Sequence, residues 1–169
     1  MSKIVKVTLD TNVLGNAEMT KIEEAARGLL VDFASTTVTD RELRGSDIQP
    51  PAKLVPEIMV LGESQLGTAV LGSDEDQGLL ESLLHIISDG KFPKPGARGC
   101  LSKGHRHQLR DAMIVLAHSR EERDILVTED KKGFIKDSHR SEIETLCSTR
   151  IMTLDEFCEF CHSLRIDTW

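Results

Sequence analysis

The chain has 169 residues, of which 39% are hydrophobic and 29% charged, and its formal net charge at pH 7 is −7. This composition is ordinary for a globular protein, and the length suffices for a substantial core, so we expect a single domain spanning residues 1–169. No apolar run approaches the roughly 20 residues that span a bilayer, and the first residues lack the pattern of a signal peptide. We therefore expect a cytoplasmic protein without a membrane partner.

Strand and helix signals alternate at the start of the chain. Residues 3–9 are mostly apolar and β-branched, which predicts a strand. Residues 20–34 carry apolar side chains at helical spacing, and Thr20 with Glu23 forms a capping-box pattern, so we predict a helix there. Residues 35–39 predict a short second strand.

The segment over residues 45–72 lacks a regular pattern. Its three prolines exclude a long helix, and glycines punctuate its two short apolar stretches. We expect an irregular insertion there, either a β-hairpin or a flap. Ser73 then caps a predicted helix over 74–88 that ends at Gly90, and residues 91–104 predict a loop.

Alternating signals return in the second half of the chain. Thr153 and Glu156 form another capping-box pattern before the last predicted helix. This alternation of strands and helices predicts an α/β sandwich with a mostly parallel sheet. The predicted elements are helices over 105–119, 139–147 and 154–165 and strands over 124–128 and 149–152.

Four acidic residues stand in settings that indicate a site. Asp10 and Asp130 directly follow apolar, β-rich runs, while Glu42 opens the segment after the second predicted strand and Asp111 falls in a predicted helix. In an open parallel sheet, functional groups collect beyond the carboxyl ends of the strands, so Asp10 and Asp130 face one crevice if their strands are neighbours. Clustered carboxylates repel unless a proton or a divalent cation compensates, which indicates a Mg²⁺ or Mn²⁺ site. Taken singly, each acid has a simpler explanation as a turn, helix-terminal or solvated residue.

Short motifs around these acids carry a resemblance to a known family. They are Leu9-Asp10-Thr11-Asn12-Val13-Leu14, Arg41-Glu42-Leu43, Asp111-Ala112 with Ile114 and Ala117, and Leu126-Val127-Thr128-Glu129-Asp130 followed by Gly133-Phe134-Ile135. In this order they resemble the motifs of the PIN-domain nuclease family over roughly residues 3–157. Residues 45–100 match none of its motifs.

The resemblance implies a three-layer α/β/α sandwich and a metal-dependent ribonuclease, a hydrolase that cleaves phosphodiester bonds in RNA. Glu42 would bind the metal directly or through water, Thr128 would orient a carboxylate or a water, and Asn12 would support Asp10. A carboxylate-held Mg²⁺ or Mn²⁺ suits this reaction, because it generates a nucleophile near neutral pH and neutralises charge on the phosphate. The residues that the resemblance assigns to metal are Asp10, Glu42, Asp111 and Asp130.

A protein of net negative charge does not attract nucleic acid through its overall field, so an RNA-cleaving enzyme needs local cations. The densest basic cluster directly precedes Asp111, and two lysines follow Asp130. Cations in these places would hold phosphates that flank the scissile one, although a solvated surface explains them equally simply. The proposed substrate-binding residues are Lys103, Arg106, Arg110 and Lys131.

Other functions stay open beside this one. A PIN-like module without catalysis would bind nucleic acid or protein, although the presence of all four acids argues against it. An aspartyl phosphatase of the haloacid-dehalogenase type also begins with an acid after its first strand, but it needs a second Asp where this chain has Asn12. The resemblance is also compatible with a toxin that has a protein inhibitor or antitoxin as partner, and with a homodimer.

The cysteines do not indicate a cofactor. In a cytosolic protein we expect all four to be reduced. Cys158, Cys161 and His162 match the haem-attachment pattern, but the segment has helical character, so we interpret the match as coincidental. The same three residues lack the second cysteine pair that would complete a zinc site.

Overall fold

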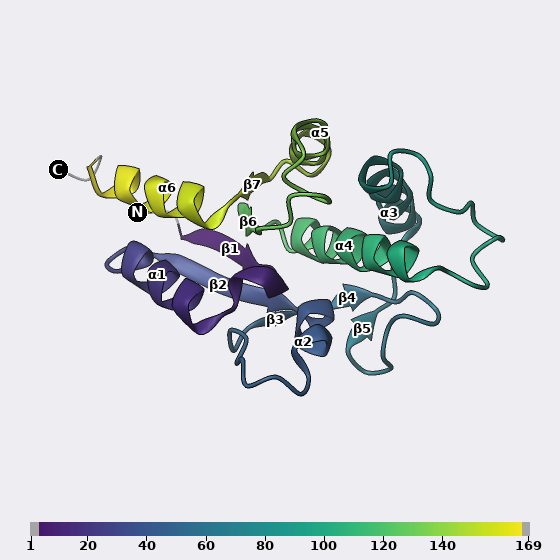
Figure 1. The fold of residues 1–169 in the computed structure, drawn as a ribbon, viewed down its shortest axis with the longest axis horizontal. Coiled ribbons are helices and arrows are strands. Elements are labelled where there is room, and N and C mark those ends of the chain that lie inside the picture. The colour runs from purple at the N-terminus through teal and green to yellow at the C-terminus, as the bar shows by residue number, and fades with distance from the viewer. Residues whose placement is uncertain (1–3, 167–169) are drawn as a thin grey trace.

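The computed structural model describes residues 4–166 (Figure 1). The strands are β1 (Val5–Leu9), β2 (Val31–Thr36), β3 (Leu54–Val55), β4 (Glu57–Ile58), β5 (Ala69–Val70), β6 (Ile125–Val127) and β7 (Arg150–Met152). The helices are the 3₁₀ helix η1 (Thr11–Val13) and α1 (Asn16–Ala26), α2 (Thr37–Leu43), α3 (Asp74–Ile87), α4 (Lys103–Arg120), α5 (Asp137–Cys147) and α6 (Leu154–Ile166).

A five-stranded sheet forms the centre of the molecule, with strand order β3-β2-β1-β6-β7 and every pair parallel. β1 lies between β2 and β6, and its last residue Leu9 is in register with Val127 of β6. Helices cover both faces, which gives the predicted three-layer α/β/α sandwich. Parallel strands need crossover connections, and the helices between them supply these connections.

Each face of the sheet has its own apolar core. On one face Val7, Leu9 and Val127 pack with Phe157 of α6, and α1 and α6 lie side by side there (Figure 1). On the other face Leu126 packs with residues of α3 and α4 such as Leu83 and Met113. Successive residues of a strand point to opposite faces, so strands buried on both faces are apolar almost without interruption.

The structure corrects the prediction for residues 20–39. The helix predicted over 20–34 is wrong: α1 begins at Asn16 and ends at Ala26, and residues 31–36 form β2. Gly28, with φ of 83°, turns the chain between them. The apolar residues that follow the glycine fit a helix by spacing, but they are equally suited to a strand buried on both faces.

The second strand, predicted over 35–39, is right only for residues 35 and 36, which end β2; residues 37–43 form α2. Thr36 ends β2 and caps α2, since its Oγ1 accepts a hydrogen bond from the Thr39 backbone N–H (3.2 Å). Thr20 lies inside α1 rather than at its start. Threonine serves both strands and helix caps, so the run of threonines was misassigned.

The alternative prediction of a β-hairpin within residues 45–72 is also wrong. β4 and β5 pair parallel in a small separate sheet, and β3 adds to the edge of the main sheet beside β2. The other predicted elements are confirmed to within about two residues at their ends, including the capping boxes at Ser73 and Thr153. No helix among residues 4–166 is long and apolar enough to cross a membrane.

Candidate functional site

The sheet topology brings two of the predicted acids together. Asp10 directly follows β1 and Asp130 follows β6, and these strands are parallel neighbours. The Asp10 backbone N–H donates to the Val127 carbonyl oxygen (3.1 Å), which extends the strand pairing to the start of the site. Both acids therefore lie at the carboxyl edge of the sheet, where ligands of open α/β sheets bind.

Asp10 is 5% exposed, and its carboxylate accepts hydrogen bonds from three donors. Oδ1 accepts from the Thr11 backbone N–H (2.7 Å), and Oδ2 accepts from Thr128 Oγ1 (2.7 Å) and Asn12 Nδ2 (2.9 Å). Thr128 comes from the end of β6 and the other two donors from η1, so Asp10 is fixed from both sides of the strand pair.

Thr128 and Asn12 also fix the loop after β6. Thr128 Oγ1 accepts from the Asp130 backbone N–H (3.1 Å), and Asn12 Oδ1 accepts from the Glu129 backbone N–H (2.8 Å). The structure thus places Thr128 and Asn12 against Asp10, as the resemblance implies. Their hydrogen bonds orient the first and the last acid relative to each other.

Glu42 reaches the site from the last turn of α2. It is exposed, and its Oε2 accepts a hydrogen bond from Thr11 Oγ1 (2.5 Å). Thr11 directly follows Asp10, so this contact attaches the second acid to the first. The contribution of Thr11 was not predicted, since its partner lies 31 residues away in sequence.

Asp111 lies on α4, and its carboxylate and that of Asp130 both lie next to Gly133. A Cβ atom at Gly133 would lie 2.4 Å from Asp130 Oδ2 and 3.4 Å from Asp111 Oδ2, so only a glycine leaves both carboxylates in place. Asp130 is also fixed by the Lys132 backbone N–H, which donates to Oδ1 (3.0 Å). Gly133 belongs to the quoted motif after β6, and its role in spacing two acids was not predicted.

Burial and neighbouring charges raise the pKa of two of the four acids. The pKa of Asp111 rises from its ordinary 3.8 to about 8, first because of burial and then because of the charges of Asp10, Asp130 and Glu42, while Arg110 opposes the rise. Burial raises the pKa of Asp10 to about 6 against the opposing hydrogen bonds from Thr128 and Thr11, and the charges of Glu42 and Asp130 raise it further.

These perturbed acids fit a divalent cation by their chemistry. Carboxylate oxygens are hard ligands of the kind that Mg²⁺ and Mn²⁺ take. A cation would offset both the burial and the repulsion that raise the two pKa values. Within residues 4–166, no three His, Cys, Asp or Glu side chains already form a group that could hold an ion. The residues that would hold the ion are the four acids, Asp10, Glu42, Asp111 and Asp130.

The basic residues next to Asp111 do not all face solvent. Arg110 Nε and Nη2 donate to Glu63 Oε2 (3.2 and 3.1 Å), and Arg106 Nε lies 3.8 Å from Glu63 Oε1. Lys103 and Lys131 are exposed. A cleft of about 330 Å³ is lined by Ile87, His107, Gln108, Asp111, Asp130, Lys132 and Gly133.

The residues of the haem-like pattern lie away from this site, on α6. Cys161 is buried in the core with Phe157, Cys158 is half-buried and His162 is exposed. All four cysteines are free thiols, and burial raises the pKa of Cys161 to about 11. A raised pKa disfavours the thiolate, which is the reactive and metal-binding form.

Comparison of the chain with models of known protein families and with curated proteins finds no match.

Proposed function

We propose that the protein is a PIN-type endoribonuclease, a phosphodiesterase that depends on Mg²⁺ or Mn²⁺. The observation that carries the proposal is the convergence of Asp10, Glu42, Asp111 and Asp130. Thr11 joins Asp10 to Glu42, and Gly133 lies against the carboxylates of Asp111 and Asp130. Burial and the neighbouring carboxylates together raise the pKa values of Asp10 and Asp111. Carboxylates with perturbed pKa values are typical of functional sites. The family motifs predict the same four residues in the same order.

The side chains have separable roles in this proposal. Asp10, Asp111 and Asp130 would hold the ion, which when bound supplies a nucleophile near neutral pH and neutralises charge on the phosphate. Thr128 and Asn12 keep the Asp10 carboxylate in one orientation by donating to its Oδ2. Because these hydrogen bonds already fix the Asp10 carboxylate, binding of the ion would not require it to reorient.

In this proposal RNA would lie along the exposed cations near Asp111 and Asp130 in the chain. Lys103 is the first residue of α4, the helix that carries Asp111, and Lys131 directly follows Asp130; both lysines are exposed. Phosphate contacts position a nucleic acid without selecting its sequence. Arg106 is exposed and would add to this surface, and Arg110 would add to it from its bond with Glu63.

The test is a cleavage assay on a mixture of single-stranded and structured RNA, run with Mn²⁺, with Mg²⁺ and with EDTA. We expect cleavage with either metal, none in EDTA, and loss of cleavage in Asp10→Asn. Asp155→Asn is the matched control, because it makes the same change at an exposed position on α6 and should retain activity. Cleavage by purified Asp10→Asn protein would assign the activity to a contaminant.

A non-catalytic interaction module is the second candidate, and a particular surface favours it. A hollow of about 750 Å³ lies between α3 and α5, with Ile86 and Leu146 among its lining residues. Apolar hollows of this size suit a ligand or a partner segment. Absence of cleavage with every metal, together with unchanged stability on adding Mn²⁺, would favour this candidate over the nuclease.

A further inference from the structure

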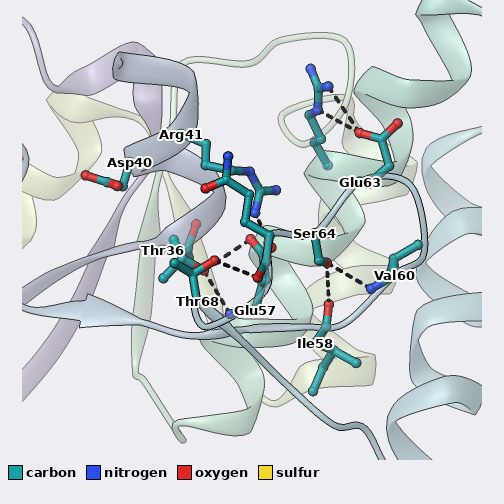
Figure 2. Close-up of polar contacts among 12 residues, drawn as sticks. Thr36, Asp40, Arg41, Glu57, Ile58, Val60, Glu63, Ser64 and Thr68 are labelled. Carbon is teal, nitrogen blue, oxygen red and sulfur yellow. Dashed lines mark hydrogen bonds and ion pairs between the residues drawn. The ribbon is translucent and has the colours of Figure 1, made fainter. Parts of the chain in front are cut away.

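Residues 57–64 match no motif, yet they contact both helices that supply a candidate metal-binding acid. Glu57 begins β4 and is fully buried, with 0% of its surface exposed. Its Oε1 accepts from Arg41 Nη1, and its Oε2 accepts from Thr37 Oγ1 (3.1 Å). Its backbone N–H donates to the same Thr37 hydroxyl (3.0 Å). Glu57 is thus bonded to both the first turn and the last turn of α2 (Figure 2).

Glu63 makes the corresponding contact with α4. Its side chain is 9% exposed and its Oε2 accepts two hydrogen bonds from the Arg110 guanidinium (3.1 and 3.2 Å). Arg106, one turn earlier on the same helix, lies 3.8 Å away. The carboxylate is therefore enclosed by two cations of α4.

The arginines are the informative part of this arrangement. Arg41 directly precedes Glu42, and Arg110 directly precedes Asp111. Two carboxylates six residues apart in one short segment therefore each bond the residue before a candidate metal-binding acid, on two different helices. Charge-assisted bonds of this kind are short, directional and roughly twice as strong as neutral ones.

The segment between the two carboxylates is itself fixed. Ser64 Oγ accepts from the Val60 backbone N–H (2.8 Å) and donates to the Ile58 carbonyl oxygen (3.2 Å). The backbone N–H groups of Glu63 and Ser64 both donate to the Val60 carbonyl oxygen (3.1 and 2.9 Å). Ile58 is buried in the same apolar cluster as Met113 of α4, and Figure 2 shows the closed turn with Glu57 and Glu63 on either side.

We propose that Glu57 and Glu63 are positioning residues and that residues 57–64 form a brace that sets the spacing of Glu42 and Asp111. Their spacing matters because neither acid receives the three hydrogen bonds that hold Asp10. The inference rests on the proposed function for the role of these two acids. The brace itself is testable without metal or RNA.

The first experiment measures the distance between the two helices in metal-free protein. Spin labels are placed by Arg44→Cys at the end of α2 and Lys103→Cys at the start of α4, both exposed, with the exposed Cys100 replaced by serine. Pulsed electron spin resonance should give one narrow distance distribution in this parent protein. Glu63→Ala should broaden or shift the distribution, and Glu63→Gln should lie between, since an amide oxygen still accepts from Arg110.

The matched control is Glu81→Ala. Glu81 accepts two hydrogen bonds of 2.7 Å from Arg98. Its replacement removes a carboxylate–arginine pair that lies outside α2 and α4, so the distance distribution should not change. Glu57→Gln would leave the Arg41 charge buried without its partner, which destabilises proteins strongly. Arg41→Met combined with Glu57→Leu avoids that isolated charge, and it should fold and broaden the distribution.

The second experiment distinguishes the brace from another role for Glu63. In that role its carboxylate would occupy the position that an RNA phosphate takes when substrate binds. With the brace, Glu63→Ala should lower Mn²⁺ affinity roughly tenfold, as loss of supporting contacts around metal ligands does, and should reduce kcat more than it changes KM. If Glu63 instead occupies a phosphate position, Glu63→Ala should leave the helix distance unchanged and lower KM. An unchanged distance distribution in both Glu63→Ala and the Arg41/Glu57 double variant overturns the brace, whether or not the protein cleaves RNA.

Discussion

Replacement of Asp111 by asparagine should stabilise the metal-free protein, and increasingly so as pH rises. In the folded protein the Asp111 carboxyl keeps its proton up to about pH 8, whereas an ordinary aspartate loses it near 3.8. Between these values the folded state binds more protons than the unfolded state, so the free energy of unfolding falls as pH rises. Asp111→Asn removes this dependence because an amide does not titrate.

The magnitude follows from the size of the shift. One proton corresponds to about 1.4 kcal/mol for each pH unit, and the interval from 3.8 to about 8 sets an upper limit of roughly 5 to 6 kcal/mol. Solvent reaches the half-buried carboxylate and screens part of this energy, so we expect Asp111→Asn to gain about 2 to 3 kcal/mol at pH 7.5. Asp10→Asn should gain less, because its carboxylate accepts three hydrogen bonds and the amide loses at least one of them.

The assay is urea unfolding in EDTA at several pH values from 5 to 8, with wild type and variant measured side by side. All other titratable groups are present in both proteins, so the difference between the two curves reports the effect of Asp111. If the free energies of unfolding of wild type and variant change in parallel over this pH range, the reasoning is refuted, because the folded state would then not raise the pKa of Asp111. Addition of Mn²⁺ at about 100 times its dissociation constant should then stabilise wild type by about 2.7 kcal/mol and the variant by much less.

Three further changes test other parts of the site. Asn12→Ala removes a donor to Asp10, so Mn²⁺ affinity measured by calorimetry should fall roughly tenfold. Gly133→Ala places a methyl group 2.4 Å from Asp130 Oδ2, so the carboxylate must move and Mn²⁺ affinity should fall by a similar factor. Lys103→Ala with Lys131→Ala should weaken RNA binding in Ca²⁺ and reduce the slope of log affinity against log salt by about 1.4, or about 0.7 for each lost contact to a single strand. Mn²⁺ affinity should be unaffected in this last variant.

Each of these has a result that would count against it. Unchanged Mn²⁺ affinity in Asn12→Ala would remove Asn12 from the site. Gly104→Ala on α4 meets no close neighbour apart from Ser102 Oγ at 3.9 Å, so an equal loss of affinity there would mean that the Gly133 effect is nonspecific. Salt plots of equal slope would assign Lys103 and Lys131 to the solvated surface.

The sequence predicted elements well where local signals agreed. Ser73 and Thr153 begin helices with capping boxes, and the apolar spacing that follows each is unambiguous. The boundary between α1 and β2 was missed because the apolar residues after Gly28 suit a helix and a doubly buried strand alike. Only the pairing of β2 with β1 and β3 decides between them, and that pairing is a tertiary property.

The site shows the same division. Asp10 and Asp130 were predicted to meet because strand ends in a parallel sheet share an edge, and the structure places them on neighbouring strands. The bond of Glu63 to Arg110 joins residues 47 positions apart, within a segment that has no periodic pattern. No local signal identifies such a partner. Long-range ion pairs of this kind become visible only once the fold is known.

The pairing of β1 with β6 also determines when the site can form as the chain is made. The hydrogen bond from Thr128 to Asp10 spans 118 positions. Most of the chain must therefore be synthesised before Asp10 can form this bond. A chain growing at roughly 5 to 20 residues per second would lack a complete set of acids for several seconds. Contacts of such long range are also slow to close during folding. A site built from these acids would therefore form only after β6 has left the ribosome.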